Sequence, residues 1–92
     1  MTKNKITIAS LAMDLKRVAL GYHSGSTETA NRFIKEALKR KVEIDIQKEK
    51  PYIHEILNKL PKTLGQKDKE KLAEDALMYS TIFQNYATHN SS

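Results

Sequence analysis

The sequence predicts an all-α fold, a compact four-helix bundle-like domain with three long helices and one short helix after Pro51. Three observations support this prediction. Apolar residues recur three or four positions apart over long stretches, which is helical periodicity. Gly and Pro number only three and two, so few positions interrupt the pattern. The connections between the periodic stretches are short, which favours antiparallel packing of neighbouring helices.

The first helix is expected over residues 6–23, with Thr7 as its N-cap. Gly25 follows it and can take the left-handed conformation that ends a helix. Ser26 or Thr27 then caps a second helix, which should lie antiparallel to the first. The apolar positions of the first helix step by three and four, and they are Ile8, Leu11, Ala12, Leu15, Val18, Ala19 and Tyr22.

The second helix is expected over residues 27–47, and its end is ambiguous. Apolar and charged residues alternate over residues 42–46, which is a strand pattern. A single short strand would have no partner in an otherwise helical chain, so we prefer a helix there. The buried face of this helix is formed by Ala30, Phe33, Ile34, Ala37 and Leu38.

A third, short helix is expected over residues 51–60. Pro51 fits its first position, where a missing N–H costs nothing. Pro61 should end it, because proline inside a helix removes a hydrogen bond and clashes with the preceding turn.

The last helix should run to about residue 88. It is capped either by Thr63, in a capping box with Gln66, or by Asp68. Its apolar stripe is the widest in the chain, so we expect the other helices to pack around it. The stripe consists of Leu72, Ala76, Tyr79, Phe83 and Tyr86.

The length and composition of the chain indicate one small globular domain. A chain of 92 residues forms a single domain with one modest hydrophobic core. Its hydrophobic fraction of 39% is far above that of a disordered chain. We expect only residues 1–5 and 89–92 to be disordered tails. The net charge of +5 permits contact with nucleic acid or an anionic membrane but requires neither.

Cysteine is absent, which excludes disulfides, thiolate zinc sites and cysteine nucleophiles. Small secreted domains usually depend on disulfides, so we expect a cytoplasmic protein. No apolar run approaches the roughly 18 residues of a membrane span. Near the N-terminus, Asp14, Lys16 and Arg17 interrupt an apolar stretch that has helical spacing, so we interpret it as part of the fold and not as a signal peptide.

No constellation of side chains predicts catalysis or metal binding. His23, His54 and His89 are too far apart in the sequence to form a recognised ligand pattern. The serines and threonines of residues 24–27 have no identifiable histidine and acid partners. We therefore predict that the protein is not an enzyme and has no cofactor, metal or small-molecule substrate.

The function predicted from the residues is that of a small helical binding or adaptor module, acting through protein–protein contacts or self-association. Tyr52, Met78 and Ile82 are apolar or aromatic residues beyond those that a narrow core stripe requires. If they remain exposed together, they mark an interaction site.

The alternative prediction is nucleic-acid binding. Residues 18–34 are similar to a helix-turn-helix, in which a Ser/Thr-capped second helix enters the major groove. That helix would be the one expected over residues 27–47. The candidate nucleic-acid contacts on it are Asn31, Arg32, Lys35, Lys39 and Arg40.

A minor alternative comes from a resemblance. In size, basic charge and all-helical pattern, the chain is similar to the small cytoplasmic immunity proteins that protect bacteria from their own peptide bacteriocins. That resemblance implies a helical bundle that acts by binding and carries no catalytic machinery.

Overall fold

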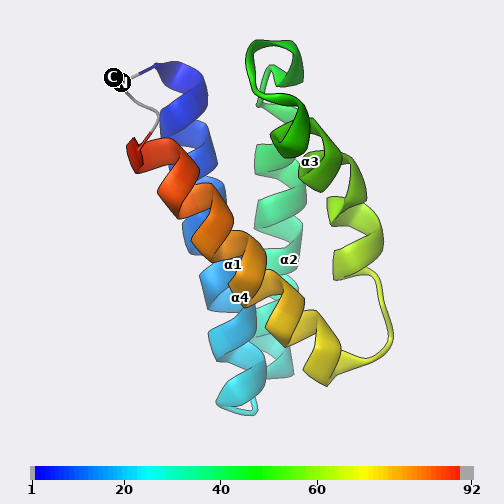
Figure 1. Ribbon diagram of the computed structural model, residues 1–92. Helices are drawn as coiled ribbons and strands as arrows, with labels where there is room; N and C mark the ends of the chain where they lie inside the picture. Colours follow the sequence, from blue (N-terminus) through cyan, green and yellow to red (C-terminus); the bar gives the residue numbers. More distant parts are fainter. Residues whose placement is uncertain (1, 90–92) are drawn as a thin grey trace.

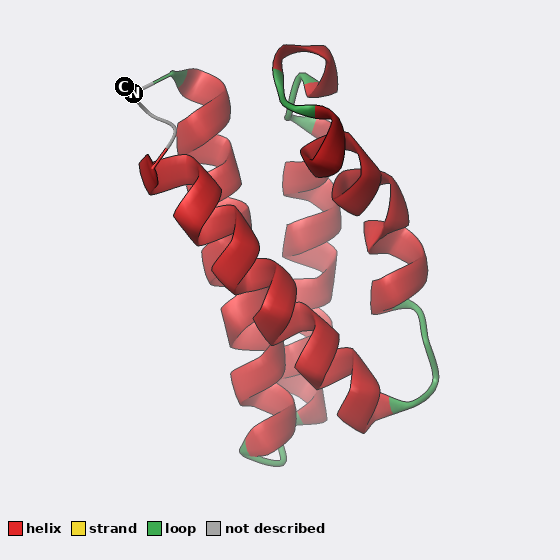
Figure 2. Ribbon diagram, viewed as in Figure 1, coloured by secondary structure: helices red, strands yellow, loops and turns green. Residues whose placement is uncertain are grey.

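The computed structural model describes residues 2–89, which form an up-and-down helical bundle (Figure 1). Figure 2 shows helices and loops, and no strands, in this part of the chain. The predicted all-α class is therefore confirmed. The elements are α1 (Lys3–His23), α2 (Thr27–Val42), the short 3-10 turn η1 (Ile46–Lys48), α3 (Pro51–Leu64) and α4 (Lys69–His89).

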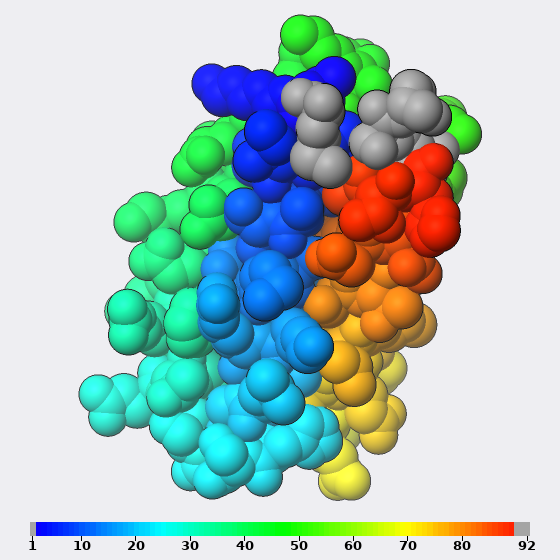
Figure 3. Space-filling view, turned by 90° about the vertical axis from the view of Figure 1, so that its left-hand side faces the viewer, coloured from blue at the N-terminus to red at the C-terminus, as the bar shows by residue number. Residues whose placement is uncertain are grey.

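Each helix contacts the helix before and after it in the chain, and α4 closes the ring against α1. The contacts of α1 with α2 and α4 are the most extensive, so α1 is the central helix. The sequence had predicted that the other helices would pack around α4. Figure 3 shows α1 between α2 and α4 on one face of the molecule. Helix α3 runs alongside α4 and contacts it less extensively (Figure 1). Helix α1 begins, and α4 ends, at the same end of the bundle.

Small side chains allow α1 and α4 to approach closely. Ala12 and Ala19 on α1 are fully buried, as are Ala73 and Ala76 on α4. The hydroxyl of Ser80 is also buried and donates to the main-chain oxygen of Ala12 at 2.7 Å. The large side chains fill the space beside this contact. Those with almost no exposed surface are Ile8, Leu11, Leu15, Val18, Ile53, Leu57, Leu60, Leu72 and Phe83.

The start of the chain is more ordered than predicted. Helix α1 begins at Lys3, and the side chain of Thr2, not Thr7, caps it by accepting from the Lys5 N–H at 3.2 Å. The prediction of a disordered tail is thus wrong for residues 2–5, because Asn4 and Lys5 are held by distant partners. His89 is the last residue of α4, and residues 1 and 90–92 lie outside the described residues.

The turn between α1 and α2 follows the prediction closely. Gly25 has φ of 80°, and its N–H donates to Tyr22 O while the Ser26 N–H donates to Gly21 O. This is the Schellman pattern that ends a helix. The Ser26 hydroxyl then caps α2 by accepting from the Thr29 N–H at 3.2 Å. Helices α1 and α2 leave this turn as antiparallel neighbours (Figure 1).

The helix predicted to continue to residue 47 ends at Val42, so that prediction is wrong for residues 43–47, and so is the strand alternative. Helix α2 ends at Val42, and the chain continues through a loop into η1, which Asp45 caps by accepting from the Gln47 N–H. Ile44 is buried and Ile46 packs against the core, whereas Val42 is exposed. The apolar alternation therefore comes from a loop that buries Ile44 and from η1, where the partly buried Ile46 packs against the core.

Helix α3 extends one turn beyond the predicted end. Pro61 lies inside the helix on its exposed side, and the helix continues to Leu64, which is buried. Burial of Leu64 compensates for the hydrogen bond that Pro61 cannot make. Asp68 then caps α4 by accepting from the Lys71 N–H at 3.1 Å, so Thr63 is not the cap.

Candidate protein-interaction site

The densest polar cluster of the described chain joins the start of α1 to the link between α2 and α3. The Glu49 carboxylate accepts from Lys5 Nζ at 2.7 Å, from the Tyr86 hydroxyl at 2.6 Å and from Asn4 Nδ2 at 2.6 Å. Its side chain is 3% exposed and that of Lys5 is 11% exposed. The Lys5 ammonium also lies 3.7 Å from the centre of the Tyr86 ring.

Two opposing effects set the ionisation of this pair. Burial alone would raise the pKa of Glu49, but the hydrogen bonds from Lys5, Tyr86 and Asn4 outweigh it and lower that pKa below 4.5. Burial alone would lower the pKa of Lys5, but its hydrogen bonds with Glu49 and Tyr86 raise it above 10.5. Both groups are therefore charged at neutral pH.

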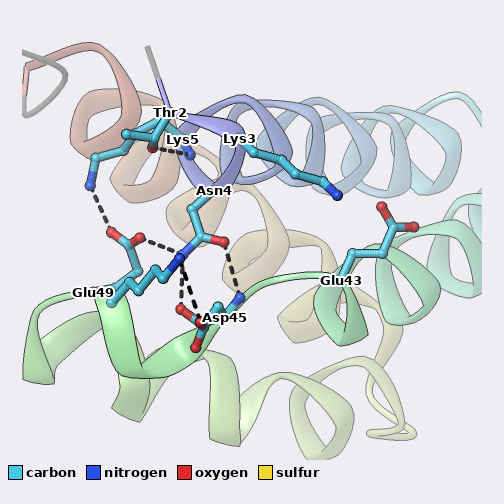
Figure 4. Close-up of a pocket in the computed structure, with 8 residues that line it drawn as sticks. Thr2, Lys3, Asn4, Lys5, Glu43, Asp45 and Glu49 are labelled. Atoms are coloured by element: carbon cyan, nitrogen blue, oxygen red, sulfur yellow. Dashed lines mark hydrogen bonds and ion pairs between the residues drawn. The ribbon is translucent and has the colours of Figure 1, made fainter.

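Beside this cluster lies a shallow cleft of about 390 Å³. Figure 4 shows Asn4 between Glu49 and Asp45, with Lys3 and Glu43 pointing toward one another at the edge. Asn4 donates to Asp45 O at 2.8 Å and accepts from the Asp45 N–H at 3.0 Å. The side chains of Asn4, Lys5, Glu49 and Tyr86 thus bond to one another and join α1, the link between α2 and α3, and α4.

The residues predicted to bind a partner form a line along the edge between α3 and α4. Tyr52 and Met78 are about half exposed, and Ile82 is partly buried. Met78, Ile82 and Tyr86 follow one another at intervals of four, so they are neighbours on one side of α4. The Tyr52 ring meets Tyr86 edge to face with ring centres 5.7 Å apart.

Two partly buried residues widen this line. Ile56 lies one turn beyond Tyr52 on α3, and Tyr79 lies beside Met78 on α4. At the rim, Lys59 and Glu55 form an exposed ion pair at 3.0 Å. We call the apolar group Tyr52, Ile56, Met78, Tyr79 and Ile82 the α3–α4 patch.

The basic residues of α2 are only partly available. Asn31, Arg32, Lys35 and Lys39 are exposed. Arg40 differs, because its guanidinium binds the buried Asp14 carboxylate through Nε at 2.7 Å. This hydrogen bond raises the pKa of Arg40 further and holds its side chain against α1.

Two further observations describe the α2 face. Glu28 and Glu36 border the same surface as Arg32 and Lys35, which lowers its net positive charge. The antiparallel α1 and α2 also differ from a helix-turn-helix, whose helices cross at about 90–120°. A nucleic acid would therefore contact the side of α2 through its phosphates, without the docking geometry of a helix-turn-helix.

An exposed apolar line on the outer face of α1 was not predicted from the sequence. Ile6, Met13 and Leu20 are all substantially exposed, and we call them the α1 stripe. Their spacing of seven residues is visible in the sequence, but the stronger core stripe of the same helix concealed it. Leu77 of α4 is exposed beside Met13, across a shallow groove.

Residues 2–89 contain neither a membrane-spanning helix nor a metal-binding cluster. None of the described helices combines the length and the apolar character that crossing a membrane requires. No cluster of three or more His, Asp or Glu side chains within these residues is arranged to hold a metal ion.

Comparison with protein-family models, with curated proteins and with solved structures found no match for this chain.

Proposed function

We propose that the protein is a small, non-catalytic helical module that binds another protein through the α3–α4 patch. The observation that supports this proposal is the exposure of Tyr52 and Met78 in line with Ile82. Single exposed apolar residues are normal on a protein surface, but a contiguous group of large ones is typical of an interaction site. Tyrosine and methionine are also enriched in protein interfaces.

The rim of the patch supports the same function. Glu55 and Lys59 provide one charge of each sign, and both are well exposed. A mixed polar rim around an apolar centre is the usual anatomy of a transient interface. We further propose that the module acts in the cytoplasm, since its sequence contains no cysteine.

The test replaces Tyr52 and Met78 by alanine together and compares the double variant with Val42→Ala. Val42 is a suitable control because it is 80% exposed and lies on α2, outside the patch. Sedimentation velocity measures self-association, and affinity capture from the source cells measures partner binding. We expect the double variant to lose the captured partner or the dimer while the control keeps it. Identical profiles for all three proteins, each with a native circular dichroism spectrum, would exclude the patch.

A second candidate function is nucleic-acid binding, favoured by the exposure of Arg32, Lys35 and Lys39 on one face of α2. Their positions differ by three and four residues, so they can follow one phosphate backbone. An electrophoretic mobility shift with random duplex at low salt tests it, repeated with Arg32→Ala/Lys39→Ala. Without a shift at micromolar wild-type protein, this candidate is eliminated.

A further inference from the structure

We infer that the α1 stripe is a second docking surface, which binds an amphipathic helix with acidic flanks from a partner protein. Ile6, Met13 and Leu20 are each between 43% and 54% exposed. Seven residues make about two helical turns, so the three side chains form one line roughly 21 Å long. A partner helix of about 14 residues is long enough to follow it.

The shape of this face fits a single helix. A groove of about 420 Å³ separates α1 from α4 beside Met13 and Leu77. A second groove of similar volume lies between α1 and α2 beside Leu20 and Phe33. Figure 3 shows α1 between these two neighbours. Helices pack by placing the side chains of one into the grooves of the other, and both grooves here are open to do so.

The charge of this face determines the kind of partner. The exposed charged side chains of α1 are Lys3, Lys16 and Arg17, all of them cationic. Asp14, the only acidic residue of this helix, is buried and paired with Arg40. The surface therefore favours a partner helix whose apolar positions are flanked by glutamate or aspartate.

The neighbouring part of α4 is compatible with such a partner. Beyond Leu77, the groove is lined by Thr81, Gln84 and Asn85, which are uncharged and able to form hydrogen bonds. Glu70 and Glu74 precede Leu77 on α4, so they lie toward one end of the line.

The same features disfavour the other occupants. Helices that lie on lipid present a wide apolar face, whereas the α1 stripe is one residue wide and has polar side chains between its members. A second copy of the chain would bring together two α1 faces whose exposed charged side chains are all cationic, which costs free energy through like-charge repulsion.

A synthetic helix provides the test. The probe is a fluorescein-labelled peptide of about 21 residues, with leucine at the first and fourth positions of each heptad and glutamate beside them. The control peptide has lysine in place of glutamate. Fluorescence anisotropy measures binding to the full chain and to three variants, Met13→Ser, Lys16→Glu and Val42→Ser. Val42→Ser removes an exposed apolar side chain away from the stripe.

We expect the acidic peptide to bind, the basic peptide not to bind, and the affinity to fall at least about tenfold in Met13→Ser and in Lys16→Glu. Val42→Ser should retain the wild-type affinity. High salt should weaken binding, because it screens exposed charges. The double variant at Tyr52 and Met78 should bind the peptide normally, which separates this inference from the proposed function of the α3–α4 patch.

Several results would overturn the inference. They are equal binding of the two peptides, no binding of the acidic peptide by about 1 mM protein, and an affinity that Met13→Ser leaves unchanged. Tighter binding to phosphatidylglycerol vesicles, lost in Met13→Ser, would assign the face to lipid. A dimer that Met13→Ser dissociates would assign it to a second copy. Circular dichroism establishes that each variant is folded, and Leu20→Ser provides an independent variant if Met13→Ser is not.

Discussion

Replacing Glu49 by glutamine should test whether the polar cluster at the start of α1 stabilises the bundle. The substitution keeps the size of the side chain and removes its charge. Lys5 then loses the carboxylate at 2.7 Å while its own side chain remains 11% exposed. Breaking one partner of a buried ion pair costs about 3–5 kcal/mol, and we expect about 3 kcal/mol because the cluster lies at the end of the bundle.

A loss of that size is large for this chain. Domains of 60–100 residues lose roughly 4–8 °C in Tm for each kcal/mol, so Glu49→Gln should unfold roughly 12–24 °C below the wild type at pH 7. Thermal circular dichroism measures the difference. The matched control is Glu55→Gln, which breaks the exposed Lys59 pair and should change Tm little.

The stability of Glu49→Gln should also depend less on pH than that of the wild type. The pKa of Glu49 is lower in the folded protein than its ordinary value of 4.5. The carboxylate therefore adds stability above pH 4.5, and that stability is lost as the pH falls through the folded-state pKa. The wild type should lose more Tm between pH 5 and pH 3 than Glu49→Gln. If the variant unfolds within about 2 °C of the wild type at pH 7, or if both have the same acid dependence, the cluster does not stabilise the fold as argued.

Three further substitutions test the packing, each by chemical denaturation. Gly21→Ala should destabilise by about 1–3 kcal/mol, because the new Cβ would lie 2.8 Å from Ala30 N; unchanged stability would mean that α1 and α2 separate easily. Arg40→Met should cost about 2–3 kcal/mol by leaving the Asp14 carboxylate buried and unpaired, and adding Asp14→Leu should restore most of it. Pro61→Ala should stabilise α3, by up to about 3 kcal/mol; a loss would show that the proline geometry is required.

Short-range features of the fold were predictable from the sequence. The core stripe of α1, the left-handed Gly25 and the Ser26 cap depend on residues within a few positions of one another. Pro51 at the start of α3 follows the same local logic. These predictions agree with the structure because local propensity and the tertiary fold favour the same conformation.

Features that depend on distant partners were not predictable. Lys5 was predicted to lie in a disordered tail, because its partner Glu49 is 44 residues away in the sequence. The end of α2 at Val42 follows from the burial of Ile44 in a loop, which periodicity alone cannot distinguish from a helix or strand. In the same way, nothing near Arg40 in the sequence indicates that it binds Asp14 and is therefore only partly exposed.

The candidate interaction residues were predictable only in part. Tyr52 and Met78 were expected to exceed the needs of the core, and both are about half exposed. Ile6, Met13 and Leu20 were overlooked, although their spacing is regular, because a helix with two apolar lines cannot be oriented from sequence alone.

Because α1 begins and α4 ends at the same end of the bundle, the order of the helices in the gene is not fixed by the fold (Figure 1). A short linker could join those two ends, and new termini could be opened in the loop between Gly65 and Asp68. Such a circular permutant would leave the Lys5–Glu49 pair intact within one chain. It would also place a fluorescent or affinity tag at the far end of the molecule from that pair.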